Sequence, residues 1–184
     1  MMIGHVNLEK SMNGTGEHFV KLVEGLDRQG VRQHVLVANG SLARRVAVYE
    51  NVSVGPVVRT AVIAFCLMPD VDVAHLHDAR SSQAGLVLRL TRSIPYILTR
   101  RTTTTPALNP VARSILNRSA GITCPTETAA SALAGTRCDA PVDVIPDISH
   151  ELGDADHATN QIAAEHHRIY RRAADTRRIP ALLI

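Results

Sequence analysis

Short apolar runs alternate with helical patterns along most of the chain, and this alternation limits the fold more than any other feature. Runs rich in branched residues and bounded by glycine, proline or polar residues are typical of buried strands, whereas apolar residues at every third or fourth position are typical of helices. We expect strands at residues 2–8, 34–38, 71–76, 96–99, 121–124 and 142–145. Strands that alternate with helices predict an α/β fold, in which helices cover a parallel sheet.

Helices are expected in most segments between these strands, at residues 17–29, 81–91, 110–118 and, after a cap at Thr126, up to Gly135. Gly30 is expected to follow the end of the first helix, because glycine is common just after a helix C-terminus. Residues 41–70 have a weaker pattern. There we expect short strands at 45–49 and 52–54 and a short helix at 57–68.

The C-terminal part is predicted to be a linker followed by an amphipathic helix, so we expect a domain at 1–150 and a linker with a helix at 151–184. Residues 151–159 are acidic and loop-like. Beyond them, apolar side chains recur at helical spacing at Ile162, Ala163, His166, Ile169, Tyr170, Ala173 and Ala174. Packing of this helix on its own domain is favoured. A helix on a membrane surface is the weaker alternative, because the apolar stripe is small and rich in alanine.

Length and cysteine content narrow the class of protein. A chain of 184 residues buries roughly 70% of its unfolded surface and needs no disulfide or structural metal. It is short for a two-lobed enzyme, which takes about 100 to 200 residues per lobe.

Three cysteines without C-x-x-C spacing fit reduced thiols in a cytosolic protein. The apolar run at 61–68 is far shorter than the ~20 residues of a membrane span, and we see no signal-peptide core. A cytoplasmic protein is therefore expected.

The charge balance gives little support to nucleic acid as a partner. Lysine and arginine number 20 against 17 acidic residues, a net charge of +3. Only 3% of the residues are aromatic, and no aromatic ladder accompanies the arginine doublets for bases to stack on. We expect no nucleic-acid binding.

The segment Asn13-Gly14-Thr15-Gly16, predicted as a loop between the first strand and the first helix, is a candidate for ligand binding. Glycines let backbone N–H groups approach an anion, and the helix N-terminus that follows adds partial positive charge. The loop is not a dinucleotide-binding fingerprint, because Phe19 stands where a third glycine is required. A plain tight turn is the alternative.

His75, His77 and Asp78 lie at the carboxyl end of a predicted strand, the edge where open α/β sheets bind ligands. Alternate residues of a strand point to the same face, so the two histidines are expected side by side. A metal site needs more than two ligands, and no cluster of cysteines or carboxylates supplies the others. We therefore predict no metal.

Arg100 and Arg101, followed by four threonines, come directly after another predicted strand. Two guanidinium groups at this edge suit a phosphate or a carboxylate, and a solvated polar loop is an equally good interpretation. Thr126 and Glu127 begin a predicted helix whose N-terminus suits an anion, although capping alone also explains Thr126.

The order of these segments resembles the N-terminal domain of a retaining glycosyltransferase of family 4, the GT-B type. The resemblance covers residues 2–150, and it is carried by the segments His-Val-Asn at 5–7, Gly-Thr-Gly-Glu-His at 14–18, Asp-Val-Ala-His-Leu-His-Asp at 72–78, Thr-Arg-Arg at 99–101, residues 120–133 and Val-Ile-Pro-Asp at 144–147. It implies a single Rossmann-like domain of three layers with a mostly parallel sheet.

In that family the N-terminal lobe binds the acceptor, the C-terminal lobe binds the nucleotide sugar, and the reaction occurs in the cleft between them. The resemblance implies that residues 14–16 face the donor phosphates and the acceptor, and that His77, Asp78 and the loop after Thr99 face the cleft. It supplies no catalytic residue in this lobe and no cofactor. Two departures stand out: many members have a histidine where Arg101 stands, and residues 147–150 differ from the usual junction between the lobes.

The largest departure is the absence of a donor lobe, since only 38 residues follow Pro146. Residues 159–173 resemble the final helix of the family, which crosses back onto the first lobe. We therefore expect an acceptor lobe joined almost directly to a crossover-type helix, as in a natural deletion or a degenerate relative.

The resemblance implies transfer of a sugar from a nucleotide sugar to a glycan or lipid-linked acceptor in cell-envelope, lipopolysaccharide or exopolysaccharide synthesis, with at most peripheral contact at the inner face of the membrane. The alternative is a non-catalytic module that binds an acceptor or an anion, and that works with a second copy or a separate donor-domain chain or is vestigial.

Overall fold

The computed structural model describes residues 1–11, 14–106, 109–136, 138–147 and 155–178. Its centre is a seven-stranded sheet with the strand order β3-β2-β1-β4-β5-β6-β7, in which every neighbouring pair is parallel. The strands are β1 (Met2–Asn7), β2 (Arg32–Val37), β3 (Val52–Val54), β4 (Val73–Leu76), β5 (Tyr96–Thr99), β6 (Gly121–Cys124) and β7 (Val142–Val144). The α/β, Rossmann-like fold predicted from the sequence is confirmed.

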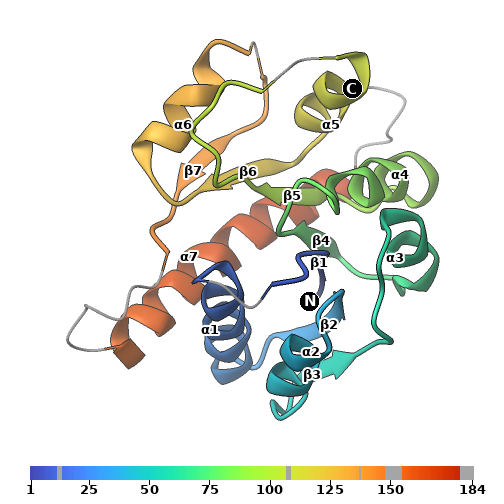
Figure 1. Cartoon of the computed structure of the whole chain (residues 1–184), viewed down its shortest axis with the longest axis vertical. Helices are drawn as coiled ribbons and strands as arrows, with labels where there is room; N and C mark the ends of the chain where they lie inside the picture. Colours follow the sequence, from blue (N-terminus) through green and yellow to red (C-terminus); the bar gives the residue numbers. More distant parts are fainter. Residues whose placement is uncertain (12–13, 107–108, 137, 148–154, 179–184) are drawn as a thin grey trace.

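Helices cover both faces of the sheet, which gives the three layers expected (Figure 1). The helices are α1 (Gly14–Arg28), α2 (Gly40–Val46), α3 (Ala61–Leu67), α4 (Ser82–Arg92), α5 (Pro110–Asn117), α6 (Glu127–Ala134) and α7 (Ala155–Asp175), followed by the short 3-10 helix η1 (Thr176–Arg178). Buried side chains of α3 to α6 share one hydrophobic core, and those of α1, α2 and α7 form two cores on the other face. In the described part of the chain, none of the helices combines the length and hydrophobicity that a membrane crossing requires.

Helix α7 packs on its own domain, as its apolar pattern predicts. Figure 1 shows it crossing the sheet diagonally beside α1, and the two helices are in extensive contact. Ile162, Ala163, His166, Ile169 and Tyr170 are buried. On the opposite face of the helix, Gln161, Glu165 and Arg168 are exposed and Arg172 is half-buried.

Three predictions about local structure are wrong. Residues 45–49 were expected as a strand, but α2 occupies 40–46, because Asn39 caps it through Ser41 N and Leu42 N and Val46 buries its side chain. Gly14 begins α1, so residues 14–16 form the first helical turn and not a loop. The linker expected at 151–159 is helical from Ala155 onward, and residues 148–154 lie outside the described part. The division into domains at residue 150 remains a prediction.

The close packing of α1 on α7 gives a first test. A Cβ atom at Gly25 would lie 2.7 Å from Ala163 Cβ and 2.8 Å from the backbone oxygen of Thr159. Because neither neighbour is the end of a flexible side chain, Gly25→Val must push the helices apart. We expect it to lower the free energy of unfolding by about 2 kcal/mol in urea denaturation.

Gly135→Ala is the matched control for this substitution. Gly135 ends α6 with a right-handed φ of −77°, and a Cβ there would meet nothing within 4 Å. We expect a change within about 0.5 kcal/mol. Equal stability of the Gly25→Val and wild-type chains would contradict the described contact between α1 and α7.

Candidate functional site

A cavity of about 640 Å³ opens where β4 and β5 end, between the sheet edge and helices α4 and α5. Small-molecule sites typically have volumes of roughly 300–1,000 Å³ and lie at this carboxyl edge of open α/β sheets. Of the residues predicted as site residues, His77, Asp78, Arg100 and Arg101 line this one cavity. The structure therefore brings these two strand ends to one cavity, and their role in binding remains a prediction.

The walls of the cavity differ in chemistry. One wall is apolar and is formed by Leu98, Ile115, Leu116 and Ile122, all of which are largely buried. The polar side is formed by Glu9, Asp78, Arg100 and Arg101. A ligand that fills the cavity therefore meets hydrocarbon on one side and charged groups on the other.

Arg100 is the cation of this wall with unused hydrogen-bonding capacity. Its Nη2 donates to the backbone oxygen of Thr104, while its Nε is buried and has no hydrogen-bond partner. Among the described residues no ion pair includes Arg100. Because Arg100 lines the cavity, the donors of its guanidinium that Thr104 does not use are available to an anionic or polar ligand group there.

Arg101 is held by neighbouring side chains. Its guanidinium donates to both oxygens of Asp147, at 3.3 Å from Nε to Oδ2 and 3.2 Å from Nη2 to Oδ1, and to the backbone oxygen of His77 at 3.3 Å. Asp147 also lies 3.2 Å from His18 Nδ1. Two groups therefore share the Asp147 carboxylate, and Arg101 serves chiefly to hold β4, β5 and the end of the β7 segment together.

Asp78 shapes the cavity through the backbone. Its Oδ2 accepts from Leu8 N at 2.6 Å, and its Oδ1 accepts from Arg80 N at 2.8 Å and Ser81 N at 3.0 Å. These bonds fix the segment after β1 and the start of α4 on either side of the cavity. Most of the acceptor capacity of Asp78 is thereby used, so its role is to position the cavity walls.

The remaining predicted residues are only partly brought together. Thr15 donates its hydroxyl to Glu9, which connects the first turn of α1 to the cavity edge. Asn13 lies outside the described residues, and Gly14 and Gly16 lie in the first turn of α1.

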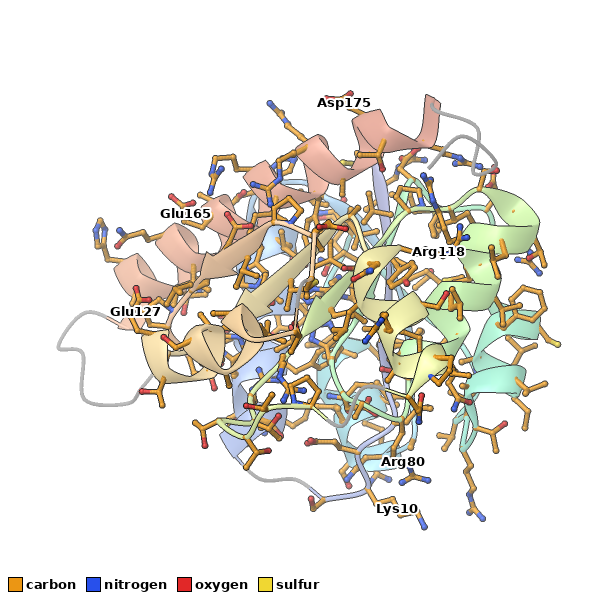
Figure 2. The ribbon with its side chains drawn as sticks, turned by 90° about the horizontal axis from the view of Figure 1, so that it is seen from above. Lys10, Arg80, Arg118, Glu127, Glu165 and Asp175 are labelled. Atoms are coloured by element: carbon orange, nitrogen blue, oxygen red, sulfur yellow. The ribbon has the colours of Figure 1, made fainter. Side chains whose placement is uncertain are left out.

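Thr126 and Glu127 do not belong to this cavity. Thr126 caps α6 by accepting from Ala129 N, and Glu127 lines a separate groove between β7 and α7. Figure 2 shows Glu127 far from Arg80, which marks the start of α4, and on the side of Glu165. Their expected role at an anion-binding helix N-terminus remains a prediction and concerns a place outside the cavity, and the capping bond alone accounts for Thr126.

A layer of buried histidines lies next to the cavity, and only the pairing of His75 with His77 was predicted from the sequence. The buried histidines of the described residues are His5, His18, His75, His77 and His166. His5 Nδ1 lies 3.0 Å from His77 Nε2, and the rings of His75 and His77 are 3.9 Å apart between centroids. The hydroxyl of Tyr170 lies 2.6 Å from His75 Nδ1, so α7 closes the layer from outside.

Burial keeps these imidazoles neutral, because desolvation disfavours the charged form. It lowers the pKa of His5 to about 3 and those of His18 and His166 to about 4. The pKa values of His75 and His77 are also well below 6.5, first through burial and then through neighbouring histidines. For His18, the Asp147 carboxylate raises the pKa but does not overcome the desolvation.

The prediction of no metal assumed two histidine ligands, and the structure shows this premise to be wrong. His5 is the direct neighbour of His75 in the register of β1 with β4, and it faces the same side of the sheet. Its place next to the other two depends on the strand order, which a single sequence does not display. The alternation of side chains along β1 was the available signal.

Comparison with known proteins gives two findings. The model of glycosyltransferase family 4 matches residues 12–147. The fold is similar to that of Anabaena Alr3699/HepE, solved in complex with UDP, with a TM-score of 0.61 and 11% sequence identity. The match covers 80% of this chain and 44% of the HepE chain, so the present chain spans less than half of that protein. Curated protein sequences gave no match. Because the family match extends over most of its length, the chain belongs to glycosyltransferase family 4, and the described residues form its N-terminal, Rossmann-like domain.

Proposed function

We propose that this domain binds the acceptor of a glycosyl transfer in the cavity beside Arg100. The observation that carries the proposal is that Arg100, a cation that takes part in no ion pair among the described residues, lines a cavity that also has an apolar wall. A guanidinium suits a carboxylate or a phosphate, and the apolar wall suits hydrocarbon or the apolar face of a sugar ring. The acceptor we propose is a glycan or lipid-linked saccharide of cell-envelope or exopolysaccharide synthesis.

The donor we propose is a nucleotide sugar. Membership in a glycosyltransferase family and the similarity in fold to a protein solved with UDP support this class of donor. Transfer requires stabilisation of the departing diphosphate, which positively charged groups and helix N-termini provide in a site that excludes water. The start of α1 and Arg100 are the elements of this domain that we assign to that task. With a nucleotide sugar as donor, we expect the proposed reaction in the cytoplasm. If the acceptor is lipid-linked, we expect it at the inner face of the membrane.

We further propose that the 184 residues alone bind without transferring. The described residues form one lobe around one sheet, whereas the reaction of the GT-B type takes place between two lobes. Loss of positioning by a second lobe removes up to about 7–11 kcal/mol of barrier reduction. Transfer then depends on a second lobe supplied by another polypeptide segment, a separate chain or a second copy.

A thermal-shift titration tests the binding site. The purified chain is titrated with UDP, GDP and their sugars, with neutral and carboxylated oligosaccharides, and with a polyprenyl-phosphate sugar. At about 100 times its dissociation constant a ligand raises the Tm by roughly 5 to 10 °C in a domain of this size. Arg100→Met is expected to weaken the binding of an anionic ligand about tenfold or more, because a hydrogen bond to a charged group is lost.

Arg113→Met is the matched control, since Arg113 is exposed on α5 and is not part of the cavity lining. It is expected to leave the affinity unchanged. An equal loss in both variants would show a general charge effect and would contradict a site at Arg100. A labelled-sugar transfer assay with the same chain is expected to give no product, and turnover by the chain alone would overturn the second proposal.

A further inference from the structure

Three histidines of the buried layer converge on one point, and the proposed binding role of Arg100 does not account for this convergence, although His77 also lines the cavity. We define the histidine cluster as His5, His75 and His77. Each offers a ring nitrogen, and these three atoms lie within 4.8 Å of one another. His75 and His77 lie on the same face of the β4 segment, as alternate residues of a strand do, and His5 is paired with His75 across the β1–β4 ladder.

The spacing within the histidine cluster is close to that of ligands on one metal ion. His5 Nδ1 and His77 Nε2 are 3.0 Å apart. Two nitrogens bound at about 2.0–2.1 Å to a tetrahedral Zn²⁺ are roughly 3.3 Å apart. The separation therefore changes by only a few tenths of an ångström on metal binding, although the rings must rotate so that both nitrogens point to the ion and the proton between them is released.

The groups around the cluster supply what metal-bound histidines require. A histidine that binds a metal through one nitrogen carries its proton on the other and donates it to an acceptor. His5 Nε2 and Gln33 Oε1 are both buried without a hydrogen-bond partner at ordinary distance and angle. The Gln33 side chain is anchored by its Nε2, which donates to the backbone oxygen of Val23 at 3.0 Å, so its Oε1 is the acceptor that we assign to that proton.

His75 has a hydroxyl group on each side of its ring. Its Nδ1 lies 2.6 Å from the Tyr170 hydroxyl and its Nε2 lies 2.7 Å from Thr99 Oγ1. Metal binding would replace one of these two contacts, and the other hydroxyl would still orient the ring. Burial also keeps the three imidazoles neutral at pH 7, which leaves their lone pairs available without competition from protons.

We propose that His5, His75 and His77 bind one divalent transition-metal ion, Zn²⁺ being the preferred ion. A set of three imidazoles favours Zn²⁺, Ni²⁺ or Cu²⁺ over Mg²⁺ and Ca²⁺, which prefer oxygen ligands. The ion would join β1 to β4 beneath α7, and these three residues would leave its fourth coordination position to another ligand. Its role is structural, and the proposal is independent of sugar transfer.

Metal retention by the wild-type chain is the first test. Chain freed of metal by EDTA is loaded with Zn²⁺ or Co²⁺, both in the folded state and during refolding, because the cluster is buried and entry requires opening. After removal of free metal, we expect one ion per chain by native mass spectrometry and the visible d–d bands of tetrahedral Co²⁺. An apo mass after both loading routes would overturn the proposal and leave a hydrogen-bonded histidine layer.

Variants then locate the ion. His5→Gln and His77→Gln are expected to abolish retention, and Gln33→Met, which removes a partner of a ligand, to weaken it roughly 10-fold to 100-fold. His157→Gln removes an exposed histidine of α7 and is expected to retain the ion. Retention by both His5→Gln and His77→Gln would assign the ion to another surface and contradict the proposal. Because Gln33→Met leaves all three histidines in place, it tests the site even if His5→Gln or His77→Gln fails to fold.

Discussion

Lowering the pH from 7 to 5 in the presence of EDTA is expected to unfold this chain. Five histidines in the described part of the chain are buried and neutral. Burial disfavours their protonation only while the chain is folded. The pKa of His5 is lowered to about 3, and those of His18 and His166 are lowered to about 4. His75 and His77 are shifted in the same direction by burial.

The sign and size of the effect follow from proton linkage. In the unfolded chain each histidine binds a proton near its ordinary pKa of 6.5, whereas the folded chain binds none until the pH approaches 4. The contribution of these buried, neutral histidines to stability is therefore fully present above pH 6.5, and it is lost as the pH falls toward their pKa values in the folded chain. In this window each histidine lowers the free energy of unfolding by about 1.4 kcal/mol per pH unit, which amounts to about 2 kcal/mol at pH 5. Five of them remove about 10 kcal/mol, comparable with the ~5–15 kcal/mol of a whole domain.

Urea denaturation at several pH values between 7.5 and 5.5 measures the slope of unfolding free energy against pH. His166→Gln is expected to reduce this slope by one histidine, because His166 is buried and its Nδ1 is held only by the backbone oxygen of Ile162. His157→Gln, at an exposed position of α7, is expected to leave the slope unchanged. A free energy that stays constant down to pH 5.5 would contradict the buried neutral layer.

Most of the fold could be predicted because its signals are local. The strands at 96–99 and 121–124 have the predicted bounds, since proline, glycine and polar residues flank short apolar runs. Residues 45–49 were misassigned because their branched and aromatic side chains favour a strand, whereas the Asn39 cap and the burial of Leu42 and Val46 decide for a helix. Those contacts are tertiary, and local propensity does not contain them.

The candidate site was predictable only where strand ends are adjacent. His77, Asp78, Arg100 and Arg101 follow β4 and β5, which are neighbours in the sheet, so their convergence follows from the parallel topology. Glu127 follows β6 and lines a different groove, which lies between β7 and α7. The histidine layer required both the strand order that sets β1 beside β4 and the docking of α7, and neither is local information.

Tyr170→Ala is expected to destabilise the chain by about 3–5 kcal/mol, the usual cost of removing a large buried aromatic side chain. Tyr170 is fully buried in the core between α1, α7 and the sheet, and its ring contacts those of His5, His75 and His166. Truncation leaves a cavity under α7 and removes the hydroxyl beside His75 Nδ1. Two penalties, lost packing and an unpaired buried nitrogen, therefore act together.

Tyr170→Phe separates these penalties, because it keeps the ring and removes only the hydroxyl. We expect it to cost about 1–2 kcal/mol. Arg171→Ala, at the next and exposed position of α7, is the control and is expected to stay within about 0.5 kcal/mol of the wild type. Urea denaturation ranks the three variants by their free energy of unfolding. If Tyr170→Ala unfolds at the wild-type urea concentration, α7 does not pack on the sheet in solution; if the expected order holds, α7 is an integral layer of this glycosyltransferase domain and not an appended tail.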